Sequence, residues 1–117
     1  MKSNSKKAIT DPLSQLSKLR GSEIIIYITG DKIPPDKFGT VIALDTLPLF
    51  YDQLSKLGKQ KKISLFLYSN GGHLNAPWPI VNLIREYCDE FEVIVPFKAL
   101  SAATLVSLGA DKVLMTP

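Results

Sequence analysis

Two short segments carry the residue types that an acyl-transfer site needs. Ser101 is followed by small residues, and the turn Ser69-Asn70-Gly71-Gly72 directly follows an apolar run. A serine can act as a nucleophile, and backbone N–H groups can stabilise the oxyanion that develops during acyl transfer. Glycines allow a backbone to approach a substrate closely. We therefore take Ser101 as the candidate nucleophile and Gly71, Gly72 and Ala102 as candidate oxyanion or substrate-binding residues.

Each segment also has a purely structural interpretation. Asn-Gly is the strongest short signal of a β-hairpin, so the glycine turn could simply reverse the chain. Pro77 and Pro79 follow it closely, and proline disfavours a returning strand. Serine is common in front of helices, so Ser101 could be a plain N-cap. Spacing alone leaves both interpretations open.

Alternating strand and helix patterns predict how these segments are positioned. Short β-branched or apolar runs predict strands at 23–29, 63–68, 92–97 and 112–115. Helical periodicity predicts a short helix after Asp11-Pro12, with Leu13, Leu16 and Leu19 on one side, and further helices at 45–57, 76–91 and 101–108. Residues 30–43 are expected to form a long loop.

This order of elements predicts an α/β fold with a parallel sheet. Ligands of such sheets bind beyond the carboxyl ends of the strands, so the glycine turn and Ser101 should face one crevice. The run 63–68 is apolar at nearly every position, as expected for a strand covered on both faces. We expect residues 1–10 to be a disordered tail and 11–117 to form a partial domain that stops after its fourth strand.

The predicted helix 76–91 contains the single cysteine and the single tryptophan of the chain. Cys88, the single cysteine, is expected on the inner face of the helix as a small core residue. Trp78 lies between two prolines, where it could pack at the helix start or line a peptide or acyl site.

Composition and charge exclude several classes of function. The net charge is +3, and much of the excess lies in a basic leader and in Lys59, Lys61 and Lys62, which we expect in one solvated loop. No arginine-and-aromatic stripe is present, so we predict no nucleic-acid binding. No apolar run approaches a membrane span, and no secretory signal is recognisable, so a cytoplasmic location is expected. The sequence has no metal-ligand cluster and no nucleotide-binding glycine motif, so no metal and no cofactor are expected.

Residues 63–117 carry a more specific signal. The segment YSNGG, a following helix and strand, and then KALSAATLVSLGADKVLM resemble the serine dehydrogenase proteinase family. That family is similar to signal peptide peptidase A and to the Clp protease proteolytic subunit, within the Clp protease/crotonase fold. The resemblance extends over roughly residues 22–117. It implies that Ser101 is the nucleophile, and that Gly71 and Ala102 supply the oxyanion N–H groups.

The resemblance also implies a general base that this chain does not provide at the matching place. Relatives use a histidine, or a lysine on another segment, and only 16 residues follow Ser101. We expect the base beyond Pro117 and the isolated chain to be inactive. Two local alternatives are weaker. His73 is more simply a solvated or substrate-lining residue, and Lys98 is more simply an exposed residue at a strand-to-helix corner.

The sequence therefore predicts a serine peptidase that forms an acyl-enzyme at Ser101. The expected partners are a peptide or protein substrate and further copies of the same chain, with membrane association of the full-length protein left open. The alternative is a non-catalytic peptide- or acyl-binding or oligomerisation module of the same fold. A crotonase-like thioester enzyme is a third interpretation, but the expected glycine-rich run after the second oxyanion donor is missing.

Overall fold

The computed structural model describes residues 12–30 and 41–117. The predicted cap Asp11 and most of the predicted loop 30–43 lie outside these residues. Residues 12–20 are helical. They are followed by β1 (Glu23–Ile28), the 3-10 turn η1 (Leu44–Thr46), α2 (Leu47–Leu57), β2 (Gln60–Tyr68), α3 (Pro77–Glu86), β3 (Cys88–Val95), α4 (Ala102–Leu108) and β4 (Lys112–Met115).

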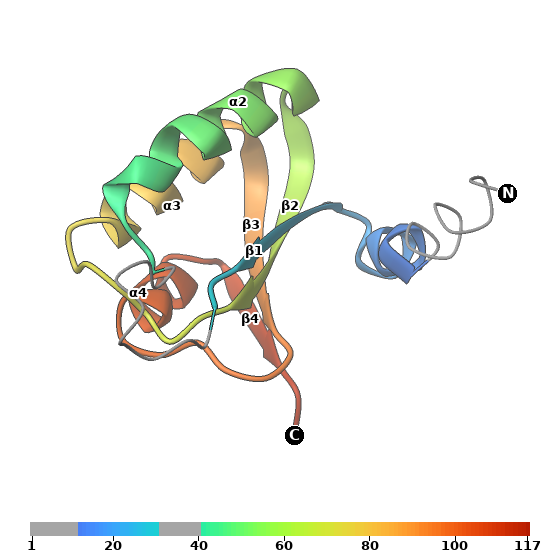
Figure 1. Cartoon of the computed structure of the whole chain (residues 1–117). Coiled ribbons are helices and arrows are strands. Elements are labelled where there is room, and N and C mark those ends of the chain that lie inside the picture. The colour runs from blue at the N-terminus through green and yellow to red at the C-terminus, as the bar shows by residue number, and fades with distance from the viewer. Residues whose placement is uncertain (1–11, 31–40) are drawn as a thin grey trace, which may run out of the picture.

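The four strands form one parallel sheet in the order β1-β2-β3-β4. The α/β fold with a parallel sheet is therefore confirmed. The helices α2, α3 and α4 lie on one side of the sheet (Figure 1). On the other face, Ser64 of β2 is fully buried beside Glu92 and Arg20, whereas Phe66 and Tyr68 are only half-buried, so the prediction that the second strand is covered on both faces holds for only part of the strand.

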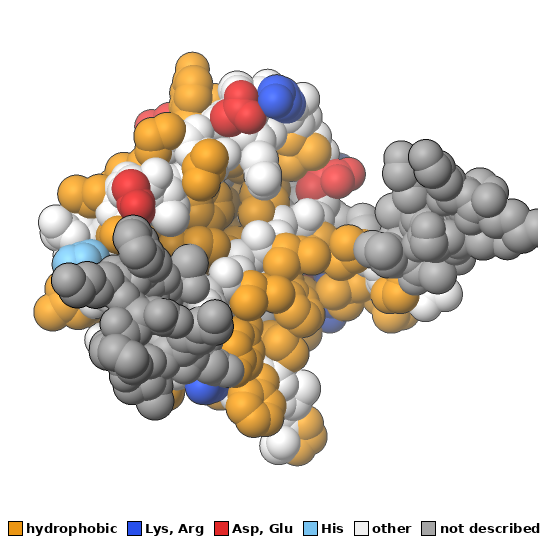
Figure 2. All heavy atoms as spheres, in the orientation of Figure 1, with side chains coloured by type: hydrophobic (Ala, Val, Ile, Leu, Met, Phe, Trp, Pro, Cys, Tyr) orange, Lys and Arg blue, Asp and Glu red, His pale blue; other side chains and the backbone are white. Residues whose placement is uncertain are grey.

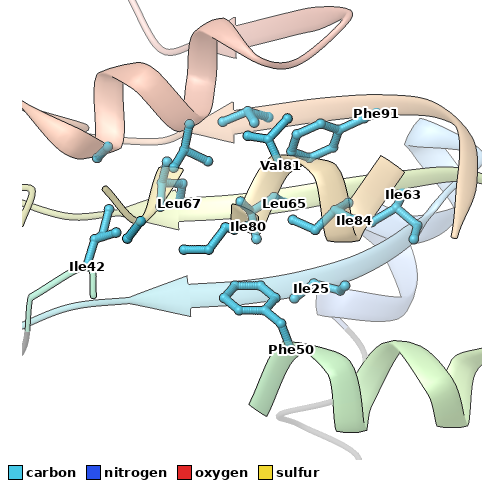
Figure 3. Packing of buried hydrophobic residues seen from close by; sticks show 14 of the residues in the cluster. Ile25, Ile42, Phe50, Ile63, Leu65, Leu67, Ile80, Val81, Ile84 and Phe91 are labelled. Carbon is cyan, nitrogen blue, oxygen red and sulfur yellow. The ribbon is translucent and has the colours of Figure 1, made fainter. Parts of the chain in front are cut away.

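The core lies between the sheet and its helices. Leu65 and Val93 of the sheet are buried completely, as are Ile80 and Ile84 of α3. Phe50 of α2 is directed toward the sheet (Figure 3) and meets the Tyr27 ring edge-on, with 5.1 Å between ring centroids. Burial of such side chains contributes roughly 1.5–3 kcal/mol each. This packing holds the strand ends in place.

The boundaries of α3 and β3 differ from the prediction. Residues 76–91 were expected to be helical, yet α3 ends at Glu86 and β3 begins at Cys88. The parallel ladder with β2 is the reason, because it starts at the pair Gln60 and Cys88 and satisfies backbone groups that a longer helix would use internally. Cys88 is consequently a half-buried strand residue, and burial raises the pKa of its thiol.

The face of the sheet away from α2, α3 and α4 carries a buried ion cluster that the sequence analysis did not predict. Glu92 is fully buried, and its carboxylate accepts hydrogen bonds from Arg20 and from Ser64 Oγ, the latter at 2.6 Å. Lys62 Nζ lies 3.4 Å from the same carboxylate. Burial alone would raise the pKa of Glu92, but these partners outweigh it and lower the pKa to about 2. The cluster ties the helix at 12–20 to the sheet.

One expectation fails at this end of the molecule. Lys61 and Lys62 belong to β2 rather than to a solvated loop, because their backbone pairs in the sheet and Lys62 faces Glu92. On the helix at 12–20, Leu13 and Leu16 are half-buried, whereas Leu19 is 81% exposed.

The face of the sheet away from the helices is apolar beyond the ion cluster. Ile26 and Ile28 of β1 are exposed there, beside the half-buried Phe66 of β2 and Ile94 of β3. Hydrophobic side chains gather over the β1 side of the surface (Figure 2). Among the described residues, no helix is long and apolar enough to cross a membrane.

Candidate functional site

The two chemistry-bearing segments meet beyond the carboxyl ends of β2 and β3. The Ser69 N–H donates to the Lys98 carbonyl at 3.2 Å, and the Leu100 N–H donates to the Ser69 carbonyl at 3.0 Å. This short parallel pairing of Ser69 with Ala99 extends the ladder past the strands. It carries the glycine turn alongside the residues that lead to Ser101, as the sheet argument predicts.

Gly71 lies directly against Ser101. A Cβ built on Gly71 would lie 2.6 Å from the Ser101 Cβ, 2.7 Å from the Leu100 carbonyl oxygen and 3.2 Å from the Ala102 nitrogen. Its φ is +110°, a conformation that side chains rarely adopt. Only glycine fits here, because both the space and the backbone exclude a side chain.

Ser101 has an unusual backbone. Its φ is 53° and its ψ is −120°, and no other non-glycine residue of the described chain has a positive φ. The side chain is exposed and makes no capping hydrogen bond to α4. The plain N-cap interpretation is therefore wrong, since a capping serine has extended dihedrals and accepts such a bond. The hairpin interpretation of the glycine turn is wrong as well, because β2 and β3 are parallel.

The three candidate oxyanion donors are not equivalent. The Gly71 N–H donates to Ser69 Oγ at 2.9 Å, and Thr29 Oγ1 donates to the same oxygen at 2.7 Å. By contrast, the N–H groups of Gly72 and Ala102 have no hydrogen-bond partner among the described residues. These two groups are the ones available to an anion beside Ser101.

A backbone contact from the segment before α2 orients Gly72. Ile42 N–H donates to the Gly71 carbonyl at 3.0 Å, and His73 N–H donates to the Ile42 carbonyl at 2.8 Å. In a parallel pair of this pattern, the N–H of the residue in between points away from the partner segment. The Gly72 N–H is thus turned away from Ile42. A Cβ on Gly72 would lie 2.1 Å from the Ile42 oxygen, so this glycine is also obligatory.

Sequence reasoning missed Thr29 and Ile42. Thr29 follows β1 directly, and a hydroxyl at that strand end was a usable signal, because all strand ends meet at one edge. Ile42 was assigned to a loop, yet it is fully buried and pairs with Gly72. No local pattern marks it.

Among the described residues, Ser101 Oγ has no hydrogen bond to either local candidate for the base. The Lys98 side chain is half-buried rather than exposed, and its Nζ lies 5.3 Å from the centre of the Tyr68 ring. His73 is exposed, and the structure uses its backbone N–H and carbonyl to hold the turn.

The remaining candidates have clear positions. Trp78 is 76% exposed, so the interpretation that it packs at the helix start is wrong. Pro77 and Pro79 occupy the first turn of α3, where proline is tolerated. Across residues 12–30 and 41–117, no group of three or more His, Cys, Asp or Glu side chains could hold a metal ion.

Comparison with known proteins gives one similar sequence. The chain is 31% identical over 109 residues to a Methanocaldococcus jannaschii protein, "Uncharacterized protein MJ0137". The match covers 88% of this chain and 37% of that relative, so the chain spans little more than a third of the relative's length. No family model matches the chain. No solved structure matches it either.

Proposed function

We propose that this chain supplies the nucleophile and the oxyanion-binding turn of a serine hydrolase, a peptidase of the Clp protease/crotonase type. The observation that carries the proposal is the positive-φ backbone of Ser101, packed against Gly71. Residues held in sparsely populated conformations cost about 1–3 kcal/mol and cluster at functional sites. A sharp strand-to-helix turn that exposes a serine oxygen is a known way to present a nucleophile.

The proposed chemistry assigns one role to each group. Ser101 Oγ attacks the acyl carbonyl carbon, its proton passes to a general base, and the C–N bond breaks as the amine leaves with a proton. The N–H groups of Gly72 and Ala102 donate to the developing oxyanion. Gly71 permits the close approach and acts as a donor only when Ser69 Oγ releases its N–H. Water then hydrolyses the acyl-enzyme.

Ser101 Oγ has no hydrogen-bond partner among the described residues, so the general base is proposed to lie outside residues 12–30 and 41–117. The proposed substrate is a peptide or protein. We further propose that the protein assembles with copies of itself and acts in the cytoplasm. The resemblance of the segment YSNGG and of KALSAATLVSLGADKVLM to serine dehydrogenase proteinases supports these assignments.

Two observations favour a second candidate, a non-catalytic peptide- or acyl-binding module. The Gly71 N–H is already satisfied by Ser69 Oγ, and Ser101 Oγ has no hydrogen-bond partner among the described residues. An activated serine normally contacts its base. A module of this kind would bind a ligand at the same edge of the sheet without turnover.

Labelling of the full-length protein with a fluorophosphonate tests the proposal. We expect covalent labelling of the wild type and its loss in Ser101→Ala. Ser55→Ala is the matched control, because Ser55 is also exposed but lies on α2, and it should label normally. Undiminished labelling of Ser101→Ala would refute the proposal. An unlabelled but folded wild type that is stabilised by peptides would instead favour the binding module.

A further inference from the structure

The hydroxyl groups of Thr29 and Ser69 form a buried pair beside the glycine turn. Thr29 follows β1, Ser69 follows β2, and their exposed fractions are 3% and 0%. Thr29 Oγ1 donates a hydrogen bond to Ser69 Oγ at 2.7 Å. The backbone of Thr29 is fixed as well, because its N–H donates to the Tyr68 carbonyl at 2.9 Å. A β-branched side chain on a fixed backbone has few rotamers, so the hydroxyl of Thr29 is held in one direction.

The hydrogen-bonding capacity of Ser69 Oγ is fully used by this pair and by Gly71. A hydroxyl has two acceptor positions and one proton to donate. One acceptor position takes the Thr29 hydroxyl, and the other takes the Gly71 N–H at 2.9 Å. Because Thr29 supplies the proton between the two hydroxyls, the proton of Ser69 is left for the Gly71 carbonyl, at a longer 3.5 Å. Ser69 therefore contacts both the N–H and the carbonyl of Gly71.

The orientation of the Gly71 carbonyl determines the direction of the Gly72 N–H. The two groups belong to one planar trans peptide unit, in which the C=O and the N–H point in opposite directions. The Gly71 carbonyl is held on one side by Ser69 Oγ and by the Ile42 N–H, the latter at 3.0 Å. The Gly72 N–H therefore points to the other side, away from both partners. The Gly71 N–H, by contrast, is occupied by Ser69 Oγ.

We infer that Thr29 and Ser69 are positioning residues for the oxyanion site. They keep the Gly71 N–H inside the turn, so that the Gly72 N–H is the one offered to the oxyanion at Ser101. The inference rests on the proposed function for the reaction, and on the hydrogen bonds of the two hydroxyls for the choice of donor. Both side chains are buried, so they act through the peptide unit between the two glycines and not on the substrate directly.

The opposite interpretation makes Ser69 a competitor of the oxyanion for the Gly71 N–H. Removing a competitor in Ser69→Ala would speed the reaction, whereas removing a positioning group slows it. The bond from Thr29 favours positioning. A competitor must turn away in each reaction cycle, and this would leave the buried Thr29 hydroxyl without its acceptor, which is costly.

Saturation labelling of the full-length protein with a fluorophosphonate tests the inference, because the phosphonyl oxygen takes the place of the oxyanion. Loss of one oxyanion donor lowers a rate constant about 10²–10³-fold, so Ser69→Ala should lower the limiting labelling rate about a hundredfold. Thr29→Val has the shape of threonine without the donor and should lower the rate about tenfold, since Ser69 itself remains. The probe concentration for half-maximal rate should stay unchanged in both variants. Thr29→Ser keeps the hydroxyl and should restore most of the rate.

Ser22→Ala is the matched control. Ser22 and Ser64 form a second buried hydroxyl pair, also at 2.7 Å, which joins the start of the β1 segment to β2. The variant should lower the thermal unfolding temperature much as Thr29→Val does, but leave the labelling rate unchanged. Equal slowing by Ser22→Ala and Thr29→Val would reduce Thr29 to a structural role and overturn the inference. Faster labelling of Ser69→Ala would overturn it as well.

Amide hydrogen exchange, followed by NMR on glycine-labelled full-length protein, does not depend on chemistry at the serine. In the wild type the Gly71 N–H should exchange slowly and the Gly72 N–H fast. Thr29→Val and Ser69→Ala should speed exchange at Gly71. This pattern in a protein that the fluorophosphonate does not label would refute the peptidase and support the arrangement of the turn. Labelling of both variants at the wild-type rate, or slower exchange at Gly72 than at Gly71, would keep the peptidase and overturn the inference.

Discussion

Replacing Gly71 by alanine tests the closest contact of the candidate site. The substitution has two costs that can be separated. A side chain at φ +110° lies in a region that is nearly exclusive to glycine, at about 1–3 kcal/mol. The new Cβ would also lie 2.6 Å from the Ser101 Cβ and 2.7 Å from the Leu100 carbonyl oxygen. Neither neighbour is the flexible end of a long side chain, so overpacking adds about 1–3 kcal/mol.

The expected loss of unfolding free energy is therefore about 2–6 kcal/mol, a large part of the roughly 5–15 kcal/mol of an ordinary domain. Urea unfolding followed by circular dichroism measures it, with the slope checked for two-state behaviour. Gly58→Ala is the matched control. Its φ is +75°, but no heavy atom lies within 4 Å of the added Cβ, so only the backbone cost applies.

The difference between the two variants isolates the contact between the glycine turn and Ser101. We expect Gly71→Ala to be less stable than Gly58→Ala by at least about 1 kcal/mol. Gly71→Ala should also lose fluorophosphonate labelling under conditions in which the variant remains folded, because the added Cβ forces Ser101 to move. Equal stability of the two variants would refute the placement of Gly71 against Ser101, and with it the site proposed above.

Two further predictions concern strain and charge. Ser101→Gly should stabilise the chain by about 1–2 kcal/mol in urea unfolding, since it relieves a sparsely populated backbone conformation. Thr104→Gly in α4 should destabilise it by about 1 kcal/mol, because it lowers helix propensity by a few tenths of a kcal/mol and removes the hydrogen bond from Thr104 Oγ1 to the Ala99 carbonyl. A destabilising Ser101→Gly would contradict the expected strain at Ser101. Glu92 has a pKa of about 2 in the folded state, below its usual 4.5, so its contribution is complete above pH 4.5 and is lost as the pH falls through 2. Between pH 4.5 and 2, protonation of Glu92 should lower the free energy of unfolding by about 3 kcal/mol. Glu92→Gln should abolish this part of the pH dependence in acid unfolding followed by fluorescence. Glu90→Gln is the control and should leave the pH dependence unchanged, because the Glu90 side chain is half-exposed.

The element types were predictable because they depend on local pattern. Runs of β-branched residues indicate strands, glycines indicate helix ends, and prolines indicate first helical turns, and each of these patterns lies within a short segment. Boundaries were less predictable. The helix expected to reach residue 91 ends at Glu86, because pairing with β2 begins at Cys88, and a long-range ladder outweighs local periodicity. The same reason explains why Lys62 is a strand residue facing Glu92.

The candidate site divides in a similar way. The serine, the two glycines and their positions after strands can be read from the sequence, and the parallel sheet then requires them to share an edge. Three features required the tertiary structure: the positive φ of Ser101, the bond from the Gly71 N–H to Ser69 Oγ, and the contact of Ile42 with Gly72. The contacts of Gly71 with Ser101 and of Gly72 with Ile42 join segments far apart in the chain, and the Ser69 Oγ that binds the Gly71 N–H also accepts a hydrogen bond from Thr29. The sequence determines which chemical groups are present. Only the packing of the folded chain decides which backbone N–H groups are already hydrogen-bonded, which remain available to a ligand, and which residue is held in a strained backbone conformation.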